Sequence, residues 1–187
     1  MKTDPIQKFI LKNERNLRLA IKTSDVWLAT RSVLVQTFQQ HLKQRLLKQL
    51  KGWEFGAYDG EFFDSAWGGY YFWKPSWEDQ YSLALQMTYQ GEQAIIGVGR
   101  DKNQFGKRPN SAELFKAITK IHSSADSNVW WEAKWKMQSP AANWREPDVL
   151  WRMHKDKKFL EEVAEQLLEL AEISVPIIDK LVRKYRK

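Results

Sequence analysis

The stretch Gln80–Gln90, QYSLALQMTYQ, decides the fold class because its residues alternate strictly between two kinds of side chain. One set is apolar or aromatic and the other is small or polar, as in Tyr81, Leu83, Leu85, Met87 and Tyr89 against Ser82, Ala84, Gln86 and Thr88. A period of two indicates a β-strand with one buried face. Gly91-Glu92 is predicted as a two-residue turn, and QAIIGVGR (93–100) as the returning strand. These strands predict an antiparallel hairpin within a sheet.

Two further segments predict strands of the same sheet. GGYYFWK (68–74) is closed by Pro75, and NVWWEAKWKM (128–137) alternates from Val129 to Met137. Between the hairpin and this last strand, a helix is predicted to begin at Asn110 or Ser111, with apolar positions Leu114, Phe115, Ile118 and Ile121. The prediction is an antiparallel sheet of about four to five strands.

Helices are predicted on both sides of the sheet in the sequence. Asp4, Pro5 and Gln7 match the start of a first helix, which is expected to bury the stripe Ile6, Phe9, Ile10 and Leu17. A second helix is expected from Ser24 or Asp25 to Gly52, with one apolar face formed by Trp27, Val35, Phe38, Leu42, Leu46 and Leu50. Val33 and Leu47 lie on the far side of that helix, which suggests a second contact such as a subunit partner, so a homo-oligomer stays open.

The C-terminal part predicts a long amphipathic helix from Asp156 to Glu172, broken or kinked at Val175-Pro176 because proline removes a backbone donor. The order of elements is therefore helices, sheet, helices, which is typical of an α+β domain. We divide the chain into a basic helical segment (1–52), an aromatic-rich sheet with one inserted helix (53–152) and C-terminal helices (153–187), together one structural domain.

Composition limits the functional classes. The chain of 187 residues has no cysteine, which excludes disulfides and thiolate metal sites and favours an intracellular, cytoplasmic protein. No apolar run approaches the ~20 residues of a membrane helix, so no membrane association is expected. The net charge of +7 comes from residues 1–52, where eleven lysines and arginines face three acids. Such asymmetry is typical of proteins that bind a polyanion or an acidic protein.

The tripeptide Glu132-Ala133-Lys134 raises the question of catalysis. Glu-x-Lys on a strand is half of the active-site signature of PD-(D/E)XK nucleases, in which a carboxylate binds Mg²⁺ or Mn²⁺ beside a lysine. Strict alternation would place Glu132 and Lys134 on one face of the strand, together with Trp130 and Lys136. Trp131 would lie on the other face. The other half of the signature needs an acidic residue upstream of Glu132, and Asp101 is the candidate for it. A charged outer strand face explains the same residues, so no catalytic residue is favoured and no cofactor is expected outside the nuclease hypothesis.

Candidate binding residues fall into three groups. The outer strand face offers Trp130, Lys134 and Lys136, and the turn at Pro75 offers Trp73 and Trp77. A basic loop follows the hairpin, with Arg100, Lys107 and Arg108. The second helix and its end carry Lys43, Lys48 and Lys51, which would contact nucleic acid together with stacking tryptophans.

Two passages resemble a known family. WGGYYFWKPSWEDQYSLALQM (67–87) with AIIGVGRD (94–101), and later Trp130-Trp131, Trp135, Asn143-Trp144, Pro147, Leu150 and Met153, are similar to the C-terminal accessory region of bacterial PD-(D/E)XK nuclease-family proteins. The resemblance spans residues 20–185. It implies an accessory domain without the nuclease domain, and it implies that Glu132-Ala133-Lys134 lies on an aromatic strand rather than in an active site.

Three functional hypotheses follow in this order. The first is a non-catalytic interaction module that binds a protein, by analogy with such nuclease relatives within a phage–host conflict system. The second is a nucleic-acid-binding protein that uses the basic helices and exposed tryptophans. The third is a diverged metal-dependent nuclease.

Overall fold

The computed structural model describes residues 4–57, 67–78, 80–88, 91–101, 110–139 and 141–185. Its elements follow the order α1 (Pro5–Ile10), α2 (Glu14–Leu47), β1 (Glu54–Ala57), β2 (Gly69–Trp73), η1 (Pro75–Trp77), β3 (Tyr81–Thr88), β4 (Gln93–Arg100), α4 (Ala112–Thr119), β5 (Asp126–Asn128), β6 (Trp131–Lys136), α5 (Pro147–Lys155) and α6 (Lys157–Tyr185). The expected α+β class with flanking helices is confirmed.

The sheet has six antiparallel strands in the order β1-β2-β3-β4-β6-β5. The predicted hairpin β3–β4 lies at its centre, and Leu83 pairs with Val98. Thr88 pairs with Gln93, and the Glu92 backbone N–H donates to the Thr88 carbonyl at 3.1 Å. The short strand β5 was not predicted, because three exposed polar residues carry no alternation.

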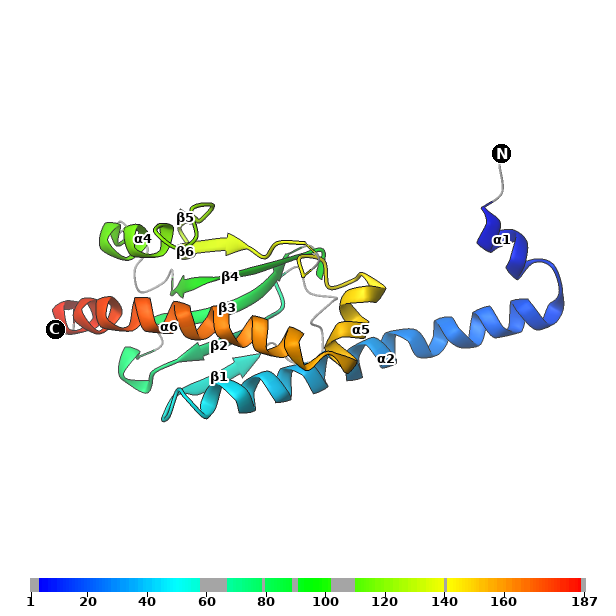
Figure 1. Ribbon diagram of the computed structural model, residues 1–187, viewed down its shortest axis with the longest axis horizontal. Helices are drawn as coiled ribbons and strands as arrows, with labels where there is room; N and C mark the ends of the chain where they lie inside the picture. Colours follow the sequence, from blue (N-terminus) through cyan, green and yellow to red (C-terminus); the bar gives the residue numbers. More distant parts are fainter. Residues whose placement is uncertain are drawn as a thin grey trace.

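The long helix α6 lies across one face of the sheet, with α2, α4 and α5 around it (Figure 1). Its apolar positions Val163, Leu167, Leu170 and Ile178 are buried in one cluster with the inward-facing residues of the central strands, among them Leu83, Leu85, Ile96 and Val98. Burying these faces against each other removes their apolar surface from water, which is the main stabilising contribution to the fold. The opposite face of the sheet is left for other contacts.

The predicted break at Val175-Pro176 is wrong, because α6 continues through Pro176 to Tyr185. Pro176 is exposed, so its ring faces away from the sheet. Buried Ile178 and Val182 follow on the inner side. Packing of this inner stripe outweighs the one backbone hydrogen bond that proline removes.

The N-terminal helices also differ from the prediction. The first helix ends at Ile10, with the capping box of Asp4 and Gln7 as expected, and α2 begins already at Glu14 with Asn13 as its cap. The predicted buried stripe is wrong: Ile6 is 69% exposed and Phe9 is 59% exposed. The reason is that the first half of α2 extends past the sheet and holds α1 away from it (Figure 1).

No helix in the described ranges is long and apolar enough to cross a membrane.

Candidate ligand-binding cavity on the outer sheet face

The sheet face opposite α6 carries a cavity of about 920 Å³. Its lining comes from four strands and the β5–β6 turn, with Trp67, Tyr71, Gln86, Ile95, Arg100, Asp101, Trp130, Trp131, Lys134 and Lys136 among the residues. Four of the predicted binding residues thus meet in one place: Arg100, Trp130, Lys134 and Lys136. Strand alternation explains the positions of Lys134 and Lys136, because their neighbours Ala133, Trp135 and Met137 belong to the helix-covered core.

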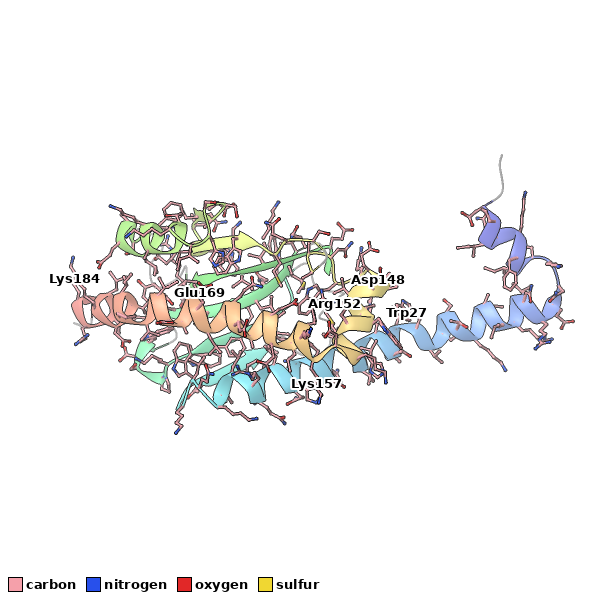
Figure 2. All side chains as sticks on the ribbon, viewed as in Figure 1. Trp27, Asp148, Arg152, Lys157, Glu169 and Lys184 are labelled. Carbon is pink, nitrogen blue, oxygen red and sulfur yellow. The ribbon has the colours of Figure 1, made fainter. Side chains whose placement is uncertain are left out.

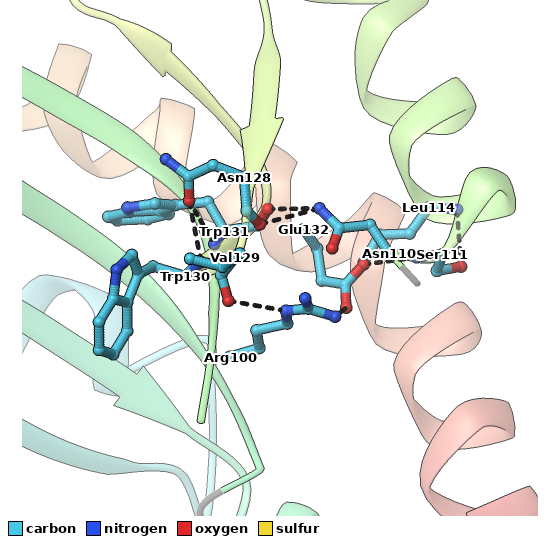
Figure 3. A network of polar contacts seen from close by, with 9 residues as sticks. All are labelled: Arg100, Asn110, Ser111, Leu114, Asn128, Val129, Trp130, Trp131 and Glu132. Carbon is cyan, nitrogen blue, oxygen red and sulfur yellow. Dashed lines mark hydrogen bonds and ion pairs between the residues drawn. The ribbon is translucent and has the colours of Figure 1, made fainter. Parts of the chain in front are cut away.

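Two tryptophans form the open part of the cavity. Trp67 precedes β2 and is 57% exposed, and Trp130 lies in the β5–β6 turn and is 53% exposed. The turn is held by Asn128, whose side-chain Oδ1 accepts hydrogen bonds from the backbone N–H groups of Trp130 (2.9 Å) and Trp131 (3.1 Å). Figure 3 shows Trp130 projecting from this turn. Large aromatic rings with such exposure are typical anchors for a ligand or partner.

A β-bulge changes the predicted faces of β6. Val98 pairs with Ala133 but Gly99 pairs with Trp131, so Glu132 is an extra residue in the ladder. Beyond the bulge the alternation is inverted, and Trp131 lines the cavity instead of the helix-covered core. The predicted inward position of Trp131 is therefore wrong. Nothing in the spacing of Trp and Glu residues in this strand signals the bulge.

Glu132 does not share a face with Lys134, contrary to the prediction. Its side chain is 2% exposed, and its two carboxylate oxygens are 3.5 Å from Arg100 Nη1 and 2.6 Å from the Ser111 backbone N–H. Ser111 caps α4, so Glu132 connects β6 to the start of that helix (Figure 3). This arrangement makes Glu132 a structural group. Lys134 lines the cavity, with its Nζ 2.8 Å from Asp126 of β5.

The remaining parts of the predicted catalytic set do not assemble around Glu132. Asp101 lines the cavity and its backbone N–H donates to the Gln80 carbonyl at 3.0 Å. Within the described residues, no group of three or more His, Asp or Glu side chains gathers in a way that could hold a metal ion.

Lys136 is the cation best placed to meet a ligand. It is exposed at the cavity, and in the part of the chain that the structure describes it has no ion-pair or hydrogen-bond partner. Lys134 is held by Asp126 and Arg100 by Glu132. The cavity thus combines exposed aromatic surface with one available positive charge, which suits a ligand with an apolar or planar group beside an acidic one.

Sequence reasoning missed Trp67, Tyr71 and Gln86. The Gln86 amide donates to the Trp67 carbonyl and to the Tyr71 hydroxyl, both at 2.9 Å, and fixes the wall of the cavity. Gln86 is 8% exposed. The available signal was a long polar amide on the small-residue face of QYSLALQMTYQ, since a buried amide needs hydrogen-bond partners.

The predicted pair near Pro75 lies elsewhere. Trp77 is fully buried in the helix-covered core, where its indole N–H donates to Asp179 of α6 at 2.7 Å, so its expected surface role is wrong. Trp73 is half-buried and packs against that core beside Gly56 of β1. Neither residue lines the cavity.

The basic residues do not form one surface with the cavity. Lys43 lies 5.1 Å from the ring centroid of Phe55 on β1, at the sheet edge opposite β5. Lys48 and Lys51 are exposed beyond it at the end of α2. Lys107 and Arg108 lie outside the described residues.

A larger groove of about 1220 Å³ lies between the end of α2 and α6. Its charged lining is mixed, with Arg45, Lys51 and Lys74 facing Glu162, Glu165, Glu169 and Glu172. Arg45 is bound to Glu161 at 2.7 Å and Lys74 to Asp179 at 2.6 Å. Such paired charges are typical of a solvated contact between helices, so the aromatic cavity is the better candidate site.

Comparison of the chain with models of protein families, with curated proteins and with solved structures gave no match.

Proposed function

We propose that this protein is a non-catalytic interaction module that binds a segment of another protein in the outer-face cavity. The observation that supports this most directly is the meeting of exposed Trp67 and Trp130 with Lys136 on the sheet face that the helices leave open. An aromatic side chain that fills a partner's pocket contributes most of the binding free energy in many protein interfaces. The cavity therefore suits a peptide segment with an apolar anchor next to an acidic residue.

The resemblance to accessory regions of PD-(D/E)XK nuclease-family proteins suggests where such a partner belongs. By that analogy we propose a role in a phage–host conflict system, with a protein of that system as the ligand.

The proposal is tested with a displayed library of random peptides selected on the wild-type protein. We expect enriched sequences that combine an aromatic or aliphatic residue with Asp or Glu. Trp130→Ala should weaken the selected peptides by about 2 kcal/mol, roughly 30-fold, because the anchor is lost. Trp151→Ala is the matched control, since Trp151 is 64% exposed on α5, outside the cavity. The affinity of the Trp151→Ala variant for the selected peptides should stay unchanged.

Loss of peptide binding in both variants, or no enrichment on the wild type, would contradict the proposal. Labelled single-stranded DNA and RNA serve as competing probes in the same assay. If they bind the wild type and lose affinity in Trp130→Ala, the cavity is a nucleic-acid site instead, because base stacking on tryptophan explains the same geometry.

A further inference from the structure

The first 30 described residues, 4–33, form an arm without a buried side chain. We use "N-terminal arm" for residues 4–33. None of residues 4–34 is buried, and Val35 is the first buried residue of α2. Within the described residues, the hydrogen bonds of 4–30 are all internal, such as that from Asn16 Nδ2 to the Phe9 carbonyl at 2.7 Å. Figures 1 and 2 show the arm projecting from the body, with Trp27 labelled on α2 in Figure 2.

The arm exposes many large apolar side chains. Of the fifteen exposed large hydrophobic residues in the described chain, ten lie in it: Ile6, Phe9, Leu11, Leu17, Leu19, Ile21, Val26, Trp27, Leu28 and Val33. A single helix gains stability mainly from packing an apolar face, and an unsupported arm of this kind is marginal in water. An exposed apolar surface of this extent marks an interaction site.

The apolar positions of the arm continue the core stripe of the body. Leu28 and Ile21 precede the buried Val35 and Leu42 at intervals of seven residues. Leu17 and Ser24 likewise precede the buried Phe38, at multiples of seven. In the body this stripe packs against other helices of the same chain, whereas Leu17, Ile21 and Leu28 of the arm are exposed. A seven-residue repeat is the pattern that packs helix against helix.

Helix pairing explains the arm better than a membrane surface does. Leu19, Val26 and Val33 form a second stripe about 180° around the helix from Leu17 and Leu28. A planar lipid interface contacts one face of a helix, and needs a large difference between the two faces. Apolar residues on two opposite sides of the arm do not match that requirement.

We propose that the N-terminal arm is a homodimerisation element in which two copies pair antiparallel about a two-fold axis near Ser24. In this arrangement Ile21 of one arm meets Leu28 of the other. Ser24 passes Ser24, where short side chains allow the helices to approach closely. The pairing is isologous and closed, as in most two-fold dimers.

The tip and base of the arm complement each other in the same arrangement. In Figure 1, α1 and α5 rise from the same side of α2, at opposite ends of the exposed stretch. A two-fold axis through the middle therefore brings α1 of one copy to α5 of the other. Exposed Ile6 and Phe9 on α1 would then meet exposed Trp151 on α5. The exposed apolar residues on α1 of each copy thus contact an exposed apolar residue on α5 of the other copy.

The contact between the two α2 stretches is too small for a stable dimer by itself. The exposed stretch of α2 spans about 30 Å at 1.5 Å per residue, and a contact strip about 10 Å wide on both arms buries roughly 600 Å². That is below the roughly 1,000 Å² expected of a specific interface. The proposed dimer therefore also requires the α1–α5 contacts, for which exposed Ile6, Phe9 and Trp151 offer further apolar surface.

The test measures molar mass against concentration by light scattering and analytical ultracentrifugation on the full chain. We expect twice the chain mass of 22.1 kDa. Leu28→Asp should raise the dimer dissociation constant about 100-fold, because it places a charge in a buried helix contact. Ala29→Asp is the matched control: it is also exposed, next to Leu28 but off the stripe, and should change the dissociation constant less than about threefold.

A wild-type monomer at about 100 μM, or equal effects of the two aspartates, would overturn the proposal. The direction of pairing is tested separately, since the chain has no cysteine of its own. Mixed Ile21→Cys and Leu28→Cys chains should form heterodimeric disulfides on oxidation, while each variant alone should not. Self-linking of each variant alone would overturn the antiparallel arrangement. Trp130→Ala, which tests the cavity, should leave the dimer intact, so the two proposals fail independently.

Discussion

At the scale of single residues, Glu132 shows how one inserted residue changes the chemistry of a strand. Alternation would place it beside Lys134, where a carboxylate and an amine could serve catalysis. The bulge instead directs it to Arg100 and to the Ser111 N–H. Both charged side chains are almost wholly removed from water, so their ion pair offsets part of the cost of burying them.

Glu132→Ala is therefore expected to destabilise the protein by about 3 kcal/mol or more, since Arg100 is left buried without its counter-charge. Urea unfolding followed by tryptophan fluorescence measures this change. Lys136→Ala, on the same strand but exposed, should change the free energy of unfolding by less than about 0.5 kcal/mol. Equal stability of the two variants would contradict a structural role for Glu132.

His122 makes stability depend on pH. Its ring stacks on Trp135 with centroids 3.7 Å apart, and burial lowers the pKa of His122, against the opposing charge of Glu169. Because the folded-state pKa lies below the value of about 6.5 in the unfolded chain, the unfolded state binds more protons near that pH. The contribution of neutral His122 is complete above about pH 6.5 and declines as the pH falls below it.

The variant His122→Phe retains a ring against Trp135 but cannot be protonated. We expect its unfolding free energy to fall less between pH 7.5 and pH 5.5 than that of the wild type, with the carboxylates contributing alike to both. Denaturant titrations at the two pH values provide the comparison. Parallel losses in the two proteins would exclude His122 as the source of the pH dependence.

At the scale of elements, the contact between β4 and β6 shapes the cavity. A Cβ added at Gly97 would lie 2.4 Å from the Ala133 carbonyl oxygen and 2.7 Å from the Lys134 Cα, both atoms of the paired strand. The two strands could not accept it without separating. Gly97 thus allows β6 to present Lys134 and Lys136 to the cavity at close range.

Gly97→Ala should lower the free energy of unfolding by about 3 kcal/mol or more, or prevent folding. The reason is that the closely packed backbone of β6 cannot move aside. Gly99→Ala is the milder comparison, since its nearest neighbour is the Ser82 hydroxyl at 3.2 Å, which can rotate away. Measuring the soluble yield and the urea midpoint of both variants tests this difference in stability. A Gly97→Ala protein as stable as Gly99→Ala would show that the strands are not so tightly paired.

At the scale of the whole molecule, charge and aromatic surface are separated. Lys43 lies beside β1 at one edge of the sheet, with Lys48 and Lys51 beyond it at the end of α2, and Trp130 and Lys136 lie toward the other edge. The net charge of +7 therefore predicts weak, salt-dependent attraction of polyanions without involvement of the cavity.

Neutralising Lys43, Lys48 and Lys51 to Gln together should weaken oligonucleotide binding and flatten its salt dependence, while leaving peptide binding unchanged. Trp130→Ala should weaken peptide binding and leave oligonucleotide binding unchanged. Fluorescence anisotropy with labelled oligonucleotides and peptides at two salt concentrations measures both. A triple variant that binds oligonucleotides like the wild type would place nucleic-acid contacts elsewhere.

The sequence by itself determined the α+β class, the β3–β4 hairpin and the start of α4, because strand alternation and helix caps are local signals. Local signals also placed Trp130, Lys134 and Lys136 on the open face, where the cavity formed. The bulge at Glu132, the continuous α6 through Pro176 and the exposure of Ile6 and Phe9 were decided only by tertiary structure. Each depends on what packs against the segment: a paired strand with a shifted register, a buried inner stripe, or, for the arm, nothing within the same fold.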